Sequence, residues 1–143
     1  MSEAEFRTPK RVVREFIRAM YDWEVDAYRR YKASIYDETD HYKILRASSR
    51  AGEERKGVVA HYCTTTERYP APFGHPPQYD PLRREEIVEV YAETPERAEV
   101  LTEYVYPEQC IDEKRRYEVV LMLDGWKIDD RMILSNKRWY SLI

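Results

Sequence analysis

The spacing of apolar residues changes midway along this chain, and that change constrains its fold more than any other feature. After Thr8-Pro9, which can cap and begin a helix, apolar residues recur at every third or fourth position as far as about Lys32. They share one face of the predicted helix: Val12, Val13, Phe16, Ile17, Met20, Trp23, Ala27 and Tyr31. Charged residues lie on the opposite face, so the spacing predicts a long amphipathic helix that can cover a sheet.

The next segment, residues 35–67, gives weaker signals. Asp37 or Thr39 can cap a short helix that runs through Ile44 and Leu45. A further helix is predicted from about Glu53 to Cys63, with its apolar residues facing inward. Glycines at positions 52 and 57 weigh against a helix here, because glycine is a poor helix former.

A proline-rich segment, Tyr69–Pro81, separates the two halves of the chain. Its five prolines exclude a helix interior and a central strand. Three aromatic residues, Tyr69, Phe73 and Tyr79, favour an ordered loop because they offer surface for docking. The loop is either a rigid platform for a partner or a structural strap over one end of the sheet, and we favour the strap.

The second half of the chain alternates apolar and polar residues in the manner of strands. Four strands are predicted: Ile87–Glu93, Ala98–Tyr106, Tyr117–Leu123 and Trp126–Ile133. The third is apolar on both faces, as a central strand should be, and Asp124-Gly125 is predicted as a two-residue hairpin turn into the fourth. Helices followed by an antiparallel meander predict an α+β fold, with the long helix on one face of a curved sheet, as a single domain over residues 1–143.

Composition excludes several classes of protein. Charged residues make up 36% of the chain, but their signs are interspersed and the net charge is −3, so nothing indicates nucleic acid or a membrane as partner. Cys63 and Cys110 form no disulfide framework, and free thiols in a reducing compartment are expected. The N-terminal residues have no apolar stretch typical of a signal peptide, so we expect a cytoplasmic protein.

Motifs for catalysis are missing from the sequence. His41, His61 and His75 are scattered without metal-ligand spacing, and neither a nucleophile elbow nor a phosphate-binding loop is present. We therefore expect no metal and no cofactor. An isomerase-like site remains an alternative, in which Glu24 acts as base beside Tyr28 or Tyr117 in an apolar cone.

Two sets of residues resemble a known family. The run Tyr117–Asp130 resembles the closing strands of the nuclear transport factor 2-like (cystatin-like) fold. Trp23-Glu24, Tyr62-Cys63-Thr64 and Phe73–Pro81 are similar to the immunity proteins of that fold, and the resemblance spans about residues 8–140. It implies a small bacterial protein that binds and neutralises a cognate toxin, without turnover of its own. The segment Pro107–Lys114 matches no pattern of the family.

The residues that would meet a partner are expected among the sheet tyrosines and the unmatched segment. The candidates for partner binding are Tyr79, Tyr91, Tyr104, Tyr106 and Cys110. A sheet face studded with tyrosine suits protein binding, but it suits the inner wall of a cone equally well. The alternative function is a small-molecule-binding protein or an isomerase- or dehydratase-like enzyme, with a pocket at Glu24, Tyr28 and Tyr117. The fold also allows a homodimer.

Overall fold

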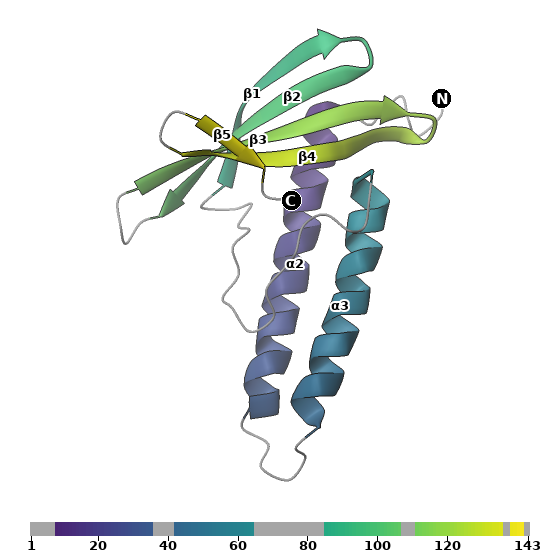
Figure 1. Ribbon diagram of the computed structural model, residues 1–143, viewed down its shortest axis with the longest axis vertical. Helices are drawn as coiled ribbons and strands as arrows, with labels where there is room; N and C mark the ends of the chain where they lie inside the picture. Colours follow the sequence, from purple (N-terminus) through teal and green to yellow (C-terminus); the bar gives the residue numbers. More distant parts are fainter. Residues whose placement is uncertain (1–7, 36–41, 65–84, 107–110, 136–137, 142–143) are drawn as a thin grey trace.

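Two helices pack on one face of an antiparallel sheet (Figure 1). The computed structural model describes residues 8–35, 42–64, 85–106, 111–135 and 138–141. The elements are α2 (Pro9–Ile35), α3 (Lys43–Tyr62), β1 (Glu85–Thr94), β2 (Arg97–Tyr106), β3 (Ile111–Met122), β4 (Gly125–Ser135) and β5 (Arg138–Ser141). The predicted α+β order is confirmed. The proline-rich segment, with Tyr79, lies outside the described residues, as does Cys110.

Helix α2 forms the long amphipathic element that the sequence predicts. The backbone N–H of Arg11 donates to Thr8 Oγ1 at 3.2 Å, so Thr8 caps the helix as expected. Seven of the eight predicted face residues are buried; Tyr31 is half-buried. Glu24 is buried too, although it is a charged residue at the edge of the apolar face. Because α2 lies against both α3 and the sheet, its buried arc is wider than the periodic residues indicate.

Helix α3 is one continuous element where the sequence predicts two. It begins at Lys43, and Tyr42 occupies the cap position without a side-chain hydrogen bond; the predicted caps Asp37 and Thr39 lie outside the described residues. Ala51 and Val59 bury against the core, and Trp23 Nε1 donates to the Ala51 carbonyl oxygen at 2.9 Å. Glycine has a low helix propensity, but α3 runs through both Gly52 and Gly57 because this packing along α2 stabilises it.

Within the described residues the sheet has five strands in the order β1-β2-β3-β4-β5, and every neighbouring pair is antiparallel. Strand β3 is central, as predicted. It begins at Ile111, so residues 111–114 belong to a strand and not to a linker. The short edge strand β5 was not predicted, since its four residues carry no alternating pattern.

The β3–β4 hairpin differs from the prediction by one residue. Met122 pairs with Gly125, so the two loop residues are Leu123 and Asp124. Gly125 itself begins β4 with a φ of 119°, a conformation that glycine adopts at little cost. Glycine is favoured at the last position of such a turn as well as inside it, and here it takes the last position.

The sheet has two different faces. The inner face lies under α2 and carries apolar rows, such as Ala98, Val119 and Ile128 in register across three strands. Phe16 of α2 packs edge-on against the Tyr117 ring, with centroids 6.3 Å apart. The outer face points away from the helices and is the face turned to the viewer in Figure 1. The core therefore uses only one side of the sheet.

Candidate functional site

A buried polar cluster interrupts the inner face where β1 begins. The Glu85 side chain has no exposed surface, and that of Arg115 is 3% exposed. One Glu85 oxygen accepts a hydrogen bond from Arg115 Nη1. The other accepts from Tyr117 Oη at 2.8 Å and from Thr102 Oγ1 at 3.2 Å. Burying a carboxylate is costly unless it is hydrogen-bonded, and here both oxygens of Glu85 have partners.

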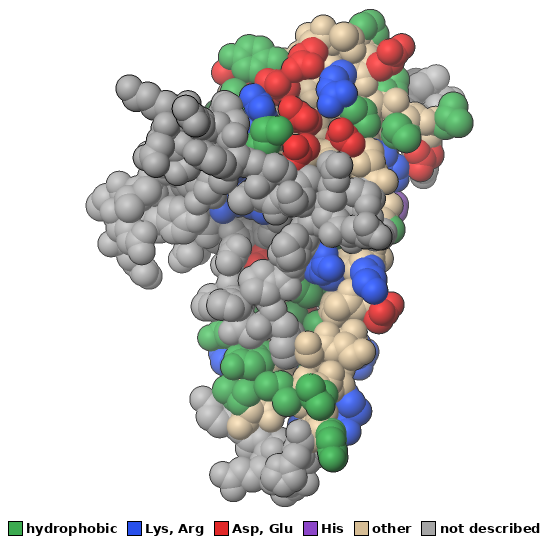
Figure 2. Space-filling view, viewed as in Figure 1, with side chains coloured by type: hydrophobic (Ala, Val, Ile, Leu, Met, Phe, Trp, Pro, Cys, Tyr) green, Lys and Arg blue, Asp and Glu red, His purple; other side chains and the backbone are tan. Residues whose placement is uncertain are grey.

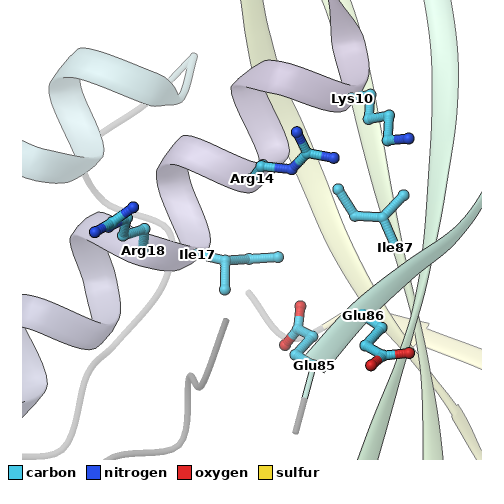
Figure 3. A pocket seen from close by; sticks show the side chains of 7 residues that line it. All are labelled: Lys10, Arg14, Ile17, Arg18, Glu85, Glu86 and Ile87. Atoms are coloured by element: carbon cyan, nitrogen blue, oxygen red, sulfur yellow. The ribbon is translucent and has the colours of Figure 1, made fainter. Parts of the chain in front are cut away.

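A hollow lies between the first turns of α2 and the start of β1. It encloses about 330 Å³, and the described residues that line it are Lys10, Arg14, Ile17, Arg18, Glu85, Glu86 and Ile87. Figure 3 shows Lys10 and Arg14 reaching from α2 towards β1, with Arg18 turned away from them. The Glu85 carboxylate is turned towards α2, and Glu86 points to the opposite side of the strand. The hollow thus has basic groups at its mouth and two isoleucines in its walls.

The outer face of the sheet carries a row of acids. Glu99 of β2 lies opposite Glu118 of β3, and Glu118 lies opposite Asp130 of β4. Tyr91 of β1 continues the row at the edge, because it pairs with Glu99. Like charges directly opposite each other on neighbouring strands are destabilising. Figure 2 shows the acidic side chains gathered over this part of the molecule.

Two arginines compensate these acids only in part. Arg97 Nη2 lies 3.6 Å from Glu118 Oε2 and 3.5 Å from Asp129 Oδ2. Arg116 Nη1 lies 3.9 Å from Glu99 Oε1, and its Nη2 lies 3.7 Å from Glu118 Oε1. These are all longer than charge-assisted hydrogen bonds, which are near 2.8 Å. Burial raises the pKa of the Glu99 carboxyl above its ordinary value, and so does the hydrogen bond that its protonated form makes with Glu93. The outer face therefore retains an excess of negative charge.

Exposed aromatic and apolar side chains adjoin the acids. Tyr91 is 47% exposed, and its hydrogen bond with Glu89 raises the pKa of its hydroxyl. Leu121, Met122 and Leu123 are exposed at the β3–β4 hairpin. The Leu121 N–H donates a hydrogen bond to the Glu96 carbonyl oxygen, which joins this hairpin to the β1–β2 turn. Protein-binding surfaces combine such aromatic and apolar anchors with a polar surround.

The residues singled out from sequence lie in different places. Tyr91 is on the outer face, whereas Tyr117 is fully buried on the inner face. Tyr104 and Tyr106 lie in β2, and their side chains are outside the described part of the structure, together with Tyr79 and Cys110. Glu24 is buried on α2 and Tyr28 is half-buried one turn later. None of Glu24, Tyr28 and Tyr117 is among the described residues that line the hollow.

Sequence reasoning missed the polar cluster and the basic mouth of the hollow. A signal for the cluster was available, because Glu85 shares the alternation of Ile87, and Arg115 shares that of Tyr117. An acid and a base at inward positions of different strands indicate a buried ion pair. The hollow gave no such signal, since it joins residues 10–18 to residues 85–87.

Over the described residues, no helix has both the length and the apolar character needed to cross a membrane. Nor do three His, Cys, Asp or Glu side chains gather there as they would around a metal ion.

Comparison with known proteins gives one match. No curated protein and no solved structure matches the chain significantly. The family model described as "NTF2 fold immunity protein" matches residues 8–141. That span covers both described helices and all five described strands, in agreement with the resemblance that the sequence motifs predicted. With its helices on one face of a curved antiparallel sheet, the chain belongs to the family of nuclear transport factor 2-fold immunity proteins.

Proposed function

We propose that this protein binds and neutralises a cognate bacterial toxin domain, and that the outer face of its sheet makes the contact. Family membership supports the immunity role. The observation that carries the location is the row Glu99, Glu118 and Asp130 beside the exposed Tyr91. An acidic face is complementary to a basic one, so the toxin domain presents a basic surface.

Neutralisation then proceeds by occlusion, with no turnover by this chain, in the cytoplasm of the producing cell. The acids steer the toxin into contact and fix its orientation, because electrostatic complementarity acts mainly on association rate and specificity. Tyr91 and the hairpin residues Met122 and Leu123 supply the apolar area. An inhibitor that must hold its toxin for the life of the cell needs nanomolar affinity, about −12 kcal/mol.

Co-expression with the toxin domain encoded beside this gene tests the immunity role. We expect cells that carry both proteins to survive, and the two proteins to elute together in gel filtration. If cells die as readily with this protein as without it, and no complex elutes, the immunity role is wrong.

A pair of tyrosine variants tests the location. Tyr91→Ala removes the exposed ring on the outer face, and Tyr42→Ala removes an exposed ring at the far end of the helices. We expect Tyr91→Ala to weaken toxin binding by about 30-fold, the effect of an interface anchor of about 2 kcal/mol. Tyr42→Ala should bind as the wild type does. A larger loss of affinity in Tyr42→Ala than in Tyr91→Ala would show that the toxin binds at the helices and not at the sheet.

Charge variants test the kind of partner. The double variant Glu99→Gln, Glu118→Gln removes two of the three acids of the row, and Asp22→Asn, Glu53→Gln makes the same charge change on exposed helical positions. We expect the first to slow association and to reduce its dependence on salt, because a basic toxin is no longer steered to the sheet. Equal effects of the two double variants would show that only net charge matters.

A further inference from the structure

We infer that the hollow between α2 and β1 binds a small organic anion, a carboxylate with an apolar body. The inference does not depend on toxin binding, since the hollow lies on the inner side of the sheet and the acidic row on the outer side. Its volume of about 330 Å³ is at the lower end of the range for ligand pockets. Such a hollow suits a molecule of a few carbon atoms beyond the carboxylate.

The first argument is the charge of α2 along the hollow. Lys10, Arg14 and Arg18 follow one another at intervals of four residues, so they share one side of the helix. No acid among the described residues forms an ion pair with any of the three. Like charges at this spacing destabilise a helix. A bound anion would relieve that repulsion.

Other arginines of the helical pair are arranged differently. Arg11 pairs with Glu15 at 3.0 Å, one turn along α2. Arg30 reaches Glu54 of α3 at 2.7 Å and Asp26 at 2.9 Å. An acid four residues away, or on the facing helix, therefore supplies the usual counter-charge in this protein. For Lys10 and Arg14, the positions four residues away along α2 carry further cations instead, and the first acid at this spacing is Asp22, one turn beyond Arg18.

The second argument is that the floor of the hollow does not cancel this charge. Glu85 is turned towards α2, but its oxygens are occupied by Arg115, Tyr117 and Thr102 (Figure 3). Glu86 points to the other side of β1. Lys10 and Arg14 therefore face the hollow without an ion pair to a described acid, and a guanidinium suits a carboxylate through paired hydrogen bonds.

The third argument decides the body of the ligand. Ile17 and Ile87 line the hollow between the cations and Glu85. Apolar walls favour a hydrocarbon chain or ring over a fully hydrated inorganic ion. The carboxylate then lies at Arg14 and Lys10, and the apolar body lies between the two isoleucines.

Sodium hexanoate is the probe, titrated into the full chain while backbone amide signals are followed by nuclear magnetic resonance. We expect saturable shifts confined to residues 10–18 and 85–87. Inorganic phosphate at the same ionic strength is the second probe. Absence of saturation with hexanoate at millimolar concentration would overturn the inference, and tighter binding of phosphate than of hexanoate would overturn the apolar part of it.

Three variants locate the site. Arg14→Gln should weaken hexanoate binding by about tenfold, the loss expected for one charged hydrogen-bonding group. Arg29→Gln makes the same change at the far, exposed end of α2 and should leave the affinity unaltered. Ile87→Phe fills the hollow and should abolish binding, with an unaltered urea midpoint to show that the chain remains folded. Equal affinities of the Arg14 and Arg29 variants would contradict the assignment.

Discussion

Replacing Glu85 by glutamine should destabilise the protein by about 3–5 kcal/mol, the usual result of removing one partner from a buried ion pair. This loss of unfolding free energy is large for a single substitution, and the burial of the cluster explains why. Glu85 and Arg115 are both almost completely buried, and Glu85 accepts hydrogen bonds from three side chains. Glutamine retains one acceptor oxygen, but it removes the negative charge that faces Arg115 and turns an amide donor towards donors.

Urea denaturation, followed by circular dichroism, measures the change. Glu86→Gln is the matched control, because Glu86 is exposed on the neighbouring position and should change the unfolding free energy by less than about 0.5 kcal/mol. The double variant Glu85→Met, Arg115→Met should cost less than Glu85→Gln alone, since it removes both buried charges. A loss below about 1 kcal/mol for Glu85→Gln, or a double variant as costly as the sum of its two single variants, would refute this account of the cluster.

Four further predictions follow from the contacts. Trp23→Ala should cost about 3–5 kcal/mol in unfolding free energy, because it empties a buried site and removes the donor to the Ala51 carbonyl; a loss below about 1 kcal/mol would show that this face of α2 is wrongly placed. Glu54→Gln should cost about 0.5–1 kcal/mol at neutral pH, since the pair with Arg30 is partly exposed. The hydrogen bond from Arg30 lowers the pKa of Glu54, so the pair contributes its stability above the ordinary carboxyl pKa and loses it as pH falls through the lowered value. If the difference in unfolding free energy between wild type and variant did not change with pH, this prediction would be wrong. The pKa of Glu99 is raised instead, so its ionised form destabilises the fold at neutral pH. Glu99→Gln should therefore raise the urea midpoint at pH 7, and this effect should become smaller as pH falls through the raised pKa. Gly125→Ala should lower stability by about 1–2 kcal/mol, because alanine is strained at a φ of 119°, whereas Gly57→Ala in the interior of α3 should raise it.

Local patterns account for most of the fold that could be predicted. The helical spacing of apolar residues located α2, and alternation located four of the five strands. The errors share one cause, which is contact with distant parts of the chain. The α3 helix continues through Gly52 and Gly57 because it packs along α2, and β5 exists because it pairs with β4. Neither contact leaves a local pattern in the sequence.

The candidate sites were predictable to a smaller extent. Alternation alone puts Tyr91 and Tyr117 on opposite faces once the irregularity between Ile87 and Glu89 is known, but a bulge of this kind cannot be located from residue types. One inserted residue reverses the face of everything beyond it. For the same reason the acidic row became visible only in the register, since Glu99, Glu118 and Asp130 are far apart in the sequence.

The two faces of the sheet also differ in how freely their residues can be exchanged. On the inner face, Val100, Tyr117 and Val119 are completely buried, so exchange there costs packing energy. On the outer face, Glu99 and Glu118 oppose each other with loose arginine contacts, and exchanging them should cost the free protein nothing or stabilise it. Folding therefore gives no reason for these acids to be present. A basic partner gives one, because attraction between its cations and these acids offsets their mutual repulsion in the complex. The unfolding free energy and the toxin affinity of the Glu99→Gln variant should accordingly change in opposite directions, which a purely structural role for Glu99 cannot produce.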